Sequence, residues 1–111
     1  MTGIAKGGEH FGPPLIRQGD VTVYTARRDG DALTVPVEVV NSGTKRAFYR
    51  FRLRVTGPGG FDTTASESAD VVGLYPGTSW PTELTVSDPG HMPPAHPHIT
   101  IESVERTEYK G

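Results

Sequence analysis

The chain of 111 residues has no cysteine, which excludes disulfide-stabilised scaffolds, thiolate metal sites, iron–sulfur clusters and cysteine nucleophiles. Long apolar runs are also missing, because no segment approaches the roughly 18 consecutive apolar residues that a membrane helix needs. The chain contains no GxSxG, no HExxH and no glycine-rich phosphate loop after an expected strand. We therefore expect neither enzymatic activity nor membrane insertion by this chain.

The chain also has little net charge, −2 at pH 7, which argues against bulk binding to nucleic acid or to an anionic membrane surface. The charges are nevertheless unevenly placed. Residues 45–54 contain five basic residues and no acid, whereas residues 61–88 contain acids but no lysine or arginine. We expect this asymmetry to appear as a surface dipole.

What the chain does have is a period of two in its apolar residues, without a helical period anywhere. Residues 31–57 read as two long strands joined by a polar turn. The residues that share the inward face are Leu33, Val35, Val37 and Val39 in the first strand and Ala47, Tyr49, Phe51, Leu53 and Val55 in the second. Each strand is therefore expected to have one buried and one solvent-exposed face.

Further strands are expected on both sides of this pair. Residues 21–28 should form a strand that Asp29-Gly30 links to the next by a type I′ turn. Residues 61–72 suggest one or two short edge strands, and Pro76-Gly77 suggests a type II turn before a strand at 80–86. In the last strand Val104 is out of phase with the preceding isoleucines, which predicts a bulge near Glu102–Ser103.

These elements predict an all-β, immunoglobulin-like antiparallel β-sandwich of six to seven strands over residues 20–111, with a small barrel as the alternative. Residues 1–19 are rich in glycine and proline and are expected to form a flexible leader or linker ahead of the sandwich.

Several residues resemble the immunoglobulin-like domains of the FxLYD type, which are common in actinobacterial lipoproteins and membrane-anchored proteins. The matching positions are Val37, Val39 and Asn41, then Phe51 and Leu53, then Leu74, Pro76 and Gly77. The resemblance spans about residues 20–109, but Arg54-Val55 stands where the name motif has Tyr-Asp. It implies the sandwich fold, an extracytoplasmic location in the cell envelope or as a secreted protein, and no catalytic residues. Because the N-terminus lacks the apolar run of a signal peptide, a cytoplasmic location is the alternative.

One candidate site is a histidine loop, residues 91–98, which contains His91, Met92, His96 and His98 among three prolines. Imidazole suits zinc and copper, and a thioether favours Cu(I), so the loop is a possible copper or zinc site. His10 in the leader would complete a set of four ligands. The alternative is an exposed loop without a metal, in which case the protein needs no cofactor.

The second candidate is the arginine strand, in which Phe48, Arg50, Arg52 and Arg54 project from one face. Such a row could contact an acidic partner. The alternative is a wet sheet face whose arginines pair across strands with acids such as Glu38.

We expect the chain to act as a non-catalytic binding or interaction module with a protein partner. The first alternative is a metal-binding protein that uses the histidine loop. The second is a cytoplasmic accessory subunit that docks through the arginine strand or an unpaired sheet edge.

Overall fold

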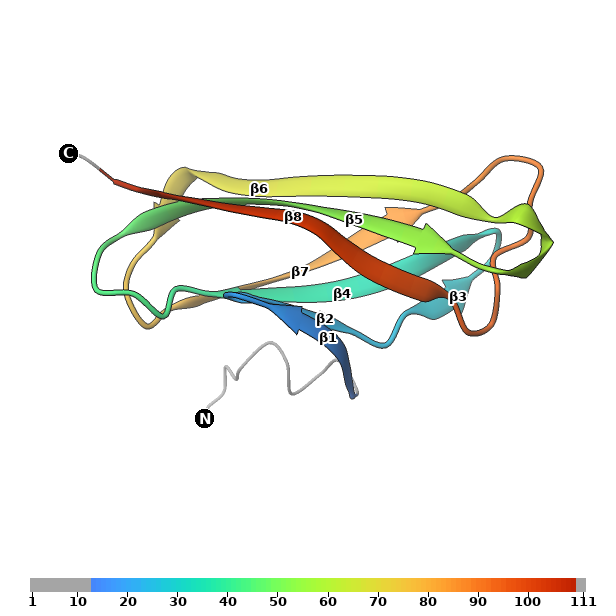
Figure 1. Cartoon of the computed structure of the whole chain (residues 1–111), viewed down its shortest axis with the longest axis horizontal. Helices are drawn as coiled ribbons and strands as arrows, with labels where there is room; N and C mark the ends of the chain where they lie inside the picture. Colours follow the sequence, from blue (N-terminus) through green and yellow to red (C-terminus); the bar gives the residue numbers. More distant parts are fainter. Residues whose placement is uncertain (1–12, 110–111) are drawn as a thin grey trace.

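Two antiparallel sheets pack face to face in a computed structural model, which describes residues 13–109 apart from the side chains of residues 69–72 (Figure 1). Sheet A contains β1 (Pro14–Gln18), β2 (Val21–Tyr24), β3 (Arg27–Asp29), β4 (Ala32–Val40) and β7 (Ser79–Val86). Sheet B contains β5 (Ala47–Thr56), β6 (Asp62–Leu74) and β8 (His98–Glu108). Residues 13–109 contain no α-helix, only a short 3₁₀ turn at Pro58–Gly60. The predicted all-β sandwich is confirmed, rather than the barrel.

The centre of each sheet is one of the two strands with the clearest alternation. β4 pairs with β2, β3 and β7, while β5 lies between β6 and β8. The inward residues are at most 2% exposed: Leu33, Val35, Val37 and Val39 on β4, and Ala47, Tyr49, Phe51, Leu53 and Val55 on β5. Burying one such large side chain contributes about 1.5–3 kcal/mol, so these two strands supply the core that holds the sheets together.

The strand count differs from the predicted six to seven, because residues 13–109 form eight strands. The expected strand at 21–28 is interrupted at Thr25-Ala26, so β2 and β3 pair separately with β4. β1 lies inside the segment predicted as a leader and pairs with β2. The part of that leader before residue 13 lies outside the described residues. The expected short strands at 61–72 are one long edge strand, β6.

Of two local features predicted from the sequence, the bulge in the last strand and the turn after Asp29, only the bulge has the predicted form. The bulge is confirmed, because Arg52 pairs with Ser103 and Leu53 with Ile101, which leaves Glu102 as the extra residue of β8. The predicted type I′ turn after Asp29 is wrong. The two residues between the paired Asp29 and Ala32 are Gly30, which has a φ of 63°, and Asp31, and no non-glycine residue in the described part of the chain has a positive φ. Type I′ needs positive φ at both central residues, whereas type II′ needs it only at the first.

Candidate functional site

The outer face of sheet B carries the arginine strand. Arg50, Arg52 and Arg54 are exposed and alternate with the buried residues of β5. Each guanidinium has an acidic partner on a neighbouring strand: Arg50 with Glu105 at 3.9 Å, Arg52 with Glu102 at 3.1 Å, and Arg54 with Asp62 at 2.7 Å. The arginine row is therefore balanced by an equal number of carboxylates and does not form a surplus of positive charge.

Glu38, the acid expected from the sequence to pair with these arginines, is not one of their partners. Glu38 lies on β4 in the other sheet, where its carboxylate accepts a hydrogen bond from the Tyr24 hydroxyl at 3.1 Å. The tightest pair on the sheet B face is bidentate, with Arg54 donating to both oxygens of Asp62 at 3.0 and 2.7 Å. The hydrogen bonds from Arg54 lower the pKa of the Asp62 carboxyl.

At one end of the same sheet lies a group that we call the aromatic patch: Arg46, Phe48, Tyr75 and Tyr109. The Arg46 guanidinium carbon lies 4.3 Å from the centre of the Tyr109 ring and 4.9 Å from that of Tyr75. Phe48 meets Tyr109 edge to face, with ring centres 5.9 Å apart. The two tyrosines are 57% and 46% exposed, whereas Phe48 is half-buried. The patch thus presents aromatic rings to solvent around a cation.

Three separate elements bring the patch together. Phe48 projects from β5, and the Tyr109 backbone N–H donates to the Arg46 carbonyl at 2.8 Å just beyond β8. Tyr75 opens the predicted Pro76-Gly77 turn, in which the Thr78 N–H donates to the Tyr75 carbonyl at 3.1 Å and Gly77 has a φ of 79°. These contacts agree with the expected type II turn.

A shallow depression continues the patch toward the arginine strand. It has a volume of about 140 Å³ and is lined by Phe48, Tyr49, Arg50, Glu105 and Thr107. One wall is therefore aromatic and another carries an ion pair. The depression is too small and too open to enclose a drug-sized ligand, because pockets of that kind measure about 300–1,000 Å³. A shape of this kind suits one side chain of a larger partner.

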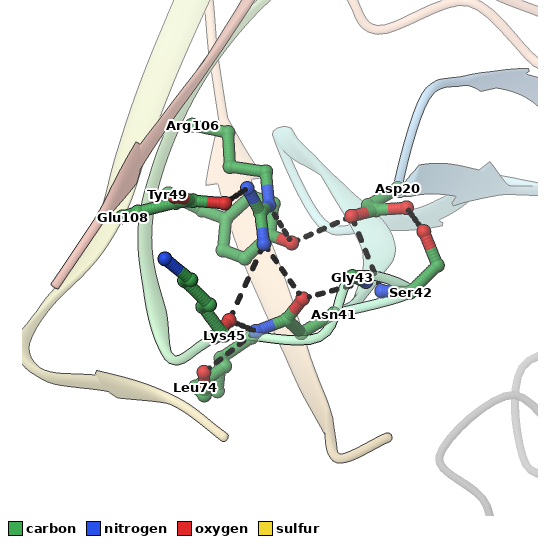
Figure 2. A network of polar contacts seen from close by, with 9 residues as sticks. All are labelled: Asp20, Asn41, Ser42, Gly43, Lys45, Tyr49, Leu74, Arg106 and Glu108. Carbon is green, nitrogen blue, oxygen red and sulfur yellow. Dashed lines mark hydrogen bonds and ion pairs between the residues drawn. The ribbon is translucent and has the colours of Figure 1, made fainter. Parts of the chain in front are cut away.

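Behind this end of the sheet, a polar network centred on Tyr49 ties the two sheets together (Figure 2). The Tyr49 side chain is almost completely buried, and its hydroxyl donates to Asp20 Oδ2 at 2.5 Å. The Tyr49 hydroxyl oxygen in turn accepts a hydrogen bond from Arg106 Nε at 3.1 Å. Asp20 lies between β1 and β2 of sheet A, while Tyr49 and Arg106 belong to sheet B, so this chain of contacts crosses the sandwich.

Asn41 extends the network to the turn that carries Tyr75. Its fully buried side chain donates from Nδ2 to the carbonyls of Lys45 and Leu74, both at 2.8 Å. Its Oδ1 accepts from the Arg106 guanidinium at 3.2 Å. Its carbonyl accepts from the Gly77 N–H at 2.9 Å. Asn41 thereby fixes the segments that hold the aromatic patch.

The network also changes the ionisation of its members. Burial opposes ionisation of Asp20, but hydrogen bonds from Ser42 and Tyr49 and the charge of Arg106 outweigh it, so the pKa of this carboxyl lies below its usual value. Burial, together with the hydrogen bond to Asp20, raises the pKa of the Tyr49 phenol. At neutral pH the network therefore holds a charged Asp20 against a neutral Tyr49.

The histidine loop has a different character from the one expected for a metal site. Pro93 and Pro94 are buried, and His91 Nδ1 lies 3.2 Å from Asp88 Oδ2. His96 and His98 are exposed, and Met92 is 63% exposed. Among the described side chains, no three or more histidine or acidic residues come together in a group that could hold a metal ion. His10 lies outside the described residues, so the predicted copper or zinc site has no geometric support in the described part of the chain.

The chain matches no known protein family, no curated protein and no solved structure. Within residues 13–109, no helix has both the length and the apolar character to cross a membrane. A proposed function must therefore rest on the positions and contacts of the described residues.

Proposed function

We propose that this chain is a non-catalytic interaction module that binds a protein partner through the aromatic patch. The observation that carries the proposal is the stacked arrangement in which Arg46 lies between the exposed rings of Tyr75 and Tyr109. Tyrosine and arginine are enriched among the residues that dominate the binding energy of protein interfaces. Only four large apolar side chains are strongly exposed in the described part of the chain, and two of them are these tyrosines.

The patch is also held in place before any partner arrives. Gly73, with a φ of 74°, brings β6 so close to β5 that a Cβ there would lie 3.0 Å from the Ala47 carbonyl oxygen and 3.2 Å from Phe48. Asn41 fixes the turn that carries Tyr75. A surface whose side chains are already ordered loses less conformational entropy when it binds. This supports a recognition role for the patch.

The arginine strand then has a secondary role. Phe48 and Arg50 line the depression beside the patch, whereas Arg52 and Arg54 extend along the sheet, each paired with an acid. Exposed ion pairs of this kind contribute little to affinity. Arg50, Arg52 and Arg54 are therefore proposed as a polar rim that favours correct orientation, in place of a net positive surface for an acidic partner.

We infer further that the sandwich is immunoglobulin-like and works outside the cytoplasm. The strand order supports an immunoglobulin-like sandwich. In sheet A, β2 and β3 together correspond to strand A, β4 to strand B and β7 to strand E. In sheet B, β5 corresponds to strand C, β6 to C′ and β8 to F. Strand G, which flanks F in immunoglobulins, has no counterpart in residues 13–109. The location rests on the resemblance to FxLYD-type domains alone.

The proposal can be tested by quantitative capture from extracts of the cells that carry the gene. The immobilised chain is compared with the double variant Tyr75→Ser and Tyr109→Ser. The matched control is Leu15→Ser with Met92→Ser, which removes the two other strongly exposed apolar side chains. One or more proteins should be captured by the wild type and the control but lost from the tyrosine variant.

Equal capture by the wild type, the tyrosine variant and the control variant would contradict the proposal. Loss in the Leu15 and Met92 variant alone would move the interface to another surface. Recovery only of cytoplasmic proteins would support the alternative of an accessory subunit.

A further inference from the structure

The open edge of β8 differs from the other sheet edges. Within residues 13–109, β8 pairs with β5 alone, so its second row of backbone N–H and C=O groups has no partner strand. Beyond the bulge at Glu102, the register with β5 runs without interruption from Ser103 to Glu108. This stretch contains neither proline nor glycine. It is therefore a continuous template for a further strand.

The other edges carry features that oppose strand addition. β7 contains Pro81, which cannot donate to a ladder, and β1 has five residues with a proline at its start. β6 places the half-buried Glu67 opposite Phe51, on the core side of the sheet. An inward-pointing charge at an edge strand is a recognised protection against pairing with another chain. After its bulge β8 also has a charge on the core side, Arg106 opposite Tyr49. This guanidinium is hydrogen-bonded to Tyr49 and Asn41, so it is directed toward sheet A and not along the open edge.

The charges of sheet B alternate from strand to strand. β6 contains Asp62 and Glu67 and no basic residue, and β5 contains only basic charges, Arg50, Arg52 and Arg54. β8 is again acidic, with Glu102, Glu105 and Glu108 against a single arginine, Arg106. Opposite charges on neighbouring strands stabilise a sheet, and like charges destabilise it. Glu102 and Glu105 already pair with arginines of β5 on one side, and a basic strand on their other side would continue this alternation.

We propose that β8 accepts an extended basic peptide from a partner protein as the next strand of sheet B. Lysine or arginine residues of that peptide would face Glu102 and Glu105 on the outer side. An apolar residue would lie beside Val104, which is half-buried against the core. A second copy of this chain fits less well, because antiparallel pairing of two β8 strands would bring two acidic strands together. The site is an edge and not the aromatic patch, so the inference goes beyond the proposed function.

The test uses the whole chain, labelled with ¹⁵N, and three synthetic nine-residue peptides. The basic probe is KVTVKVTVK, and the acidic probe is EVTVEVTVE. The third probe, KPTPKPTPK, has the charge of the first but cannot form a ladder, because proline lacks the N–H group. Binding is measured by amide chemical shifts and by amide hydrogen exchange.

We expect KVTVKVTVK to bind, with shifts and slowed exchange concentrated at Ser103–Glu108, and at least tenfold weaker binding of the other two peptides. The variant Glu102→Lys with Glu105→Lys should reverse the preference in favour of the acidic probe. The matched control is Glu83→Lys on sheet A, where Glu83 also pairs with an exposed arginine. This control should behave like the wild type.

Equal binding of the lysine–proline probe would overturn the proposal, because it would show charge attraction without strand pairing. Shifts centred on β6 or β1, or no binding of any probe, would overturn it as well. If the double variant does not fold, the exchange pattern of the wild type with the three probes still decides the matter. Glu105 also lines the depression beside the aromatic patch, but the peptide test leaves Tyr75 and Tyr109 unchanged and the capture test leaves Glu102 and Glu105 unchanged, so the two proposals can fail separately.

Discussion

Removing one oxygen atom, by Tyr49→Phe, should loosen the sandwich at the end that holds the aromatic patch. The Tyr49 hydroxyl makes two hydrogen bonds to charged groups, one to Asp20 and one from Arg106. Hydrogen bonds to charged groups contribute about 1.5–3 kcal/mol each. Both partners keep other contacts, with Ser42 and Glu108, and water can reach them. We therefore expect a total loss of about 2 kcal/mol, which is below the roughly 3 kcal/mol that is the low end for two such bonds.

The loss can be measured by urea unfolding followed by circular dichroism, with thermal unfolding as a second readout. For a domain of this size, a loss of this magnitude corresponds to a decrease in Tm of about 10 °C. The matched control is Tyr75→Phe, which removes the hydroxyl of an exposed tyrosine and should change stability by less than about 0.5 kcal/mol.

The double variant Tyr49→Phe with Asp20→Asn tests whether the two side chains act together. Residues that share a network usually show a coupling energy of about 0.5–3 kcal/mol. Additive effects, or a Tyr49→Phe variant as stable as the wild type, would refute the view that this network ties the sheets together.

Three further predictions concern stability. Gly57→Ala should cost about 1–3 kcal/mol, because its backbone is extended but an added Cβ would overlap with the buried ring of Pro94; an unchanged urea midpoint would contradict this. Arg52→Gln should change the free energy of unfolding by less than about 1 kcal/mol, because the ion pair of Arg52 with Glu102 is exposed. A larger loss of stability in urea unfolding would mean that the arginine strand contributes substantially to the stability of the fold. The pKa of Asp20 is lowered in the folded chain, so the folded chain binds fewer protons there than the unfolded chain. The stabilisation that ionised Asp20 gives to the folded state is therefore complete above about pH 5. It is lost as pH falls through the pKa of the unfolded state and then through that of the folded state. The stability difference between Asp20→Asn and the wild type should therefore shrink from about pH 5 downward, and a difference that stays constant to about pH 2 would rule this out.

The core could be predicted from the sequence because it depends on local alternation. The inward residues of β4 and β5 follow a strict period of two, and all of them are buried. The bulge at Glu102 was also visible, because Val104 breaks the phase of the strand and an extra residue is the simplest repair. In each of these cases the information lies within one strand.

The errors concern elements whose structure depends on distant partners. Residues 14–18 show no alternation, and their strand exists because the edge of β2 offers hydrogen-bond partners. The partners of the arginines were also unreadable, because register places Glu105 and Glu102 beside β5, whereas Glu38 belongs to the other sheet. Sequence alternation gives the face of a side chain but not the strand beside it.

The aromatic patch was largely missed for the same reason. Phe48 was named with the arginine strand, and the turn that carries Tyr75 was predicted, but nothing in the sequence joins Tyr75 to Tyr109. Each tyrosine directly follows the end of a strand, and only the sheet order β6-β5-β8 places these two strand ends on either side of the start of β5, next to Arg46. Asn41 was visible only as part of the family resemblance, and its bonds to Leu74 and Gly77 explain why an asparagine suits that position.

The most direct test of the interaction function is photo-crosslinking in the cells that carry the gene. A photoreactive phenylalanine analogue replaces Tyr75 or Tyr109 in the patch, or Thr85, which is exposed on β7 of the opposite sheet. We predict that both patch positions form an adduct with the same protein and that position 85 does not. No adduct at positions 75 and 109, or equal yields at all three positions, would contradict it.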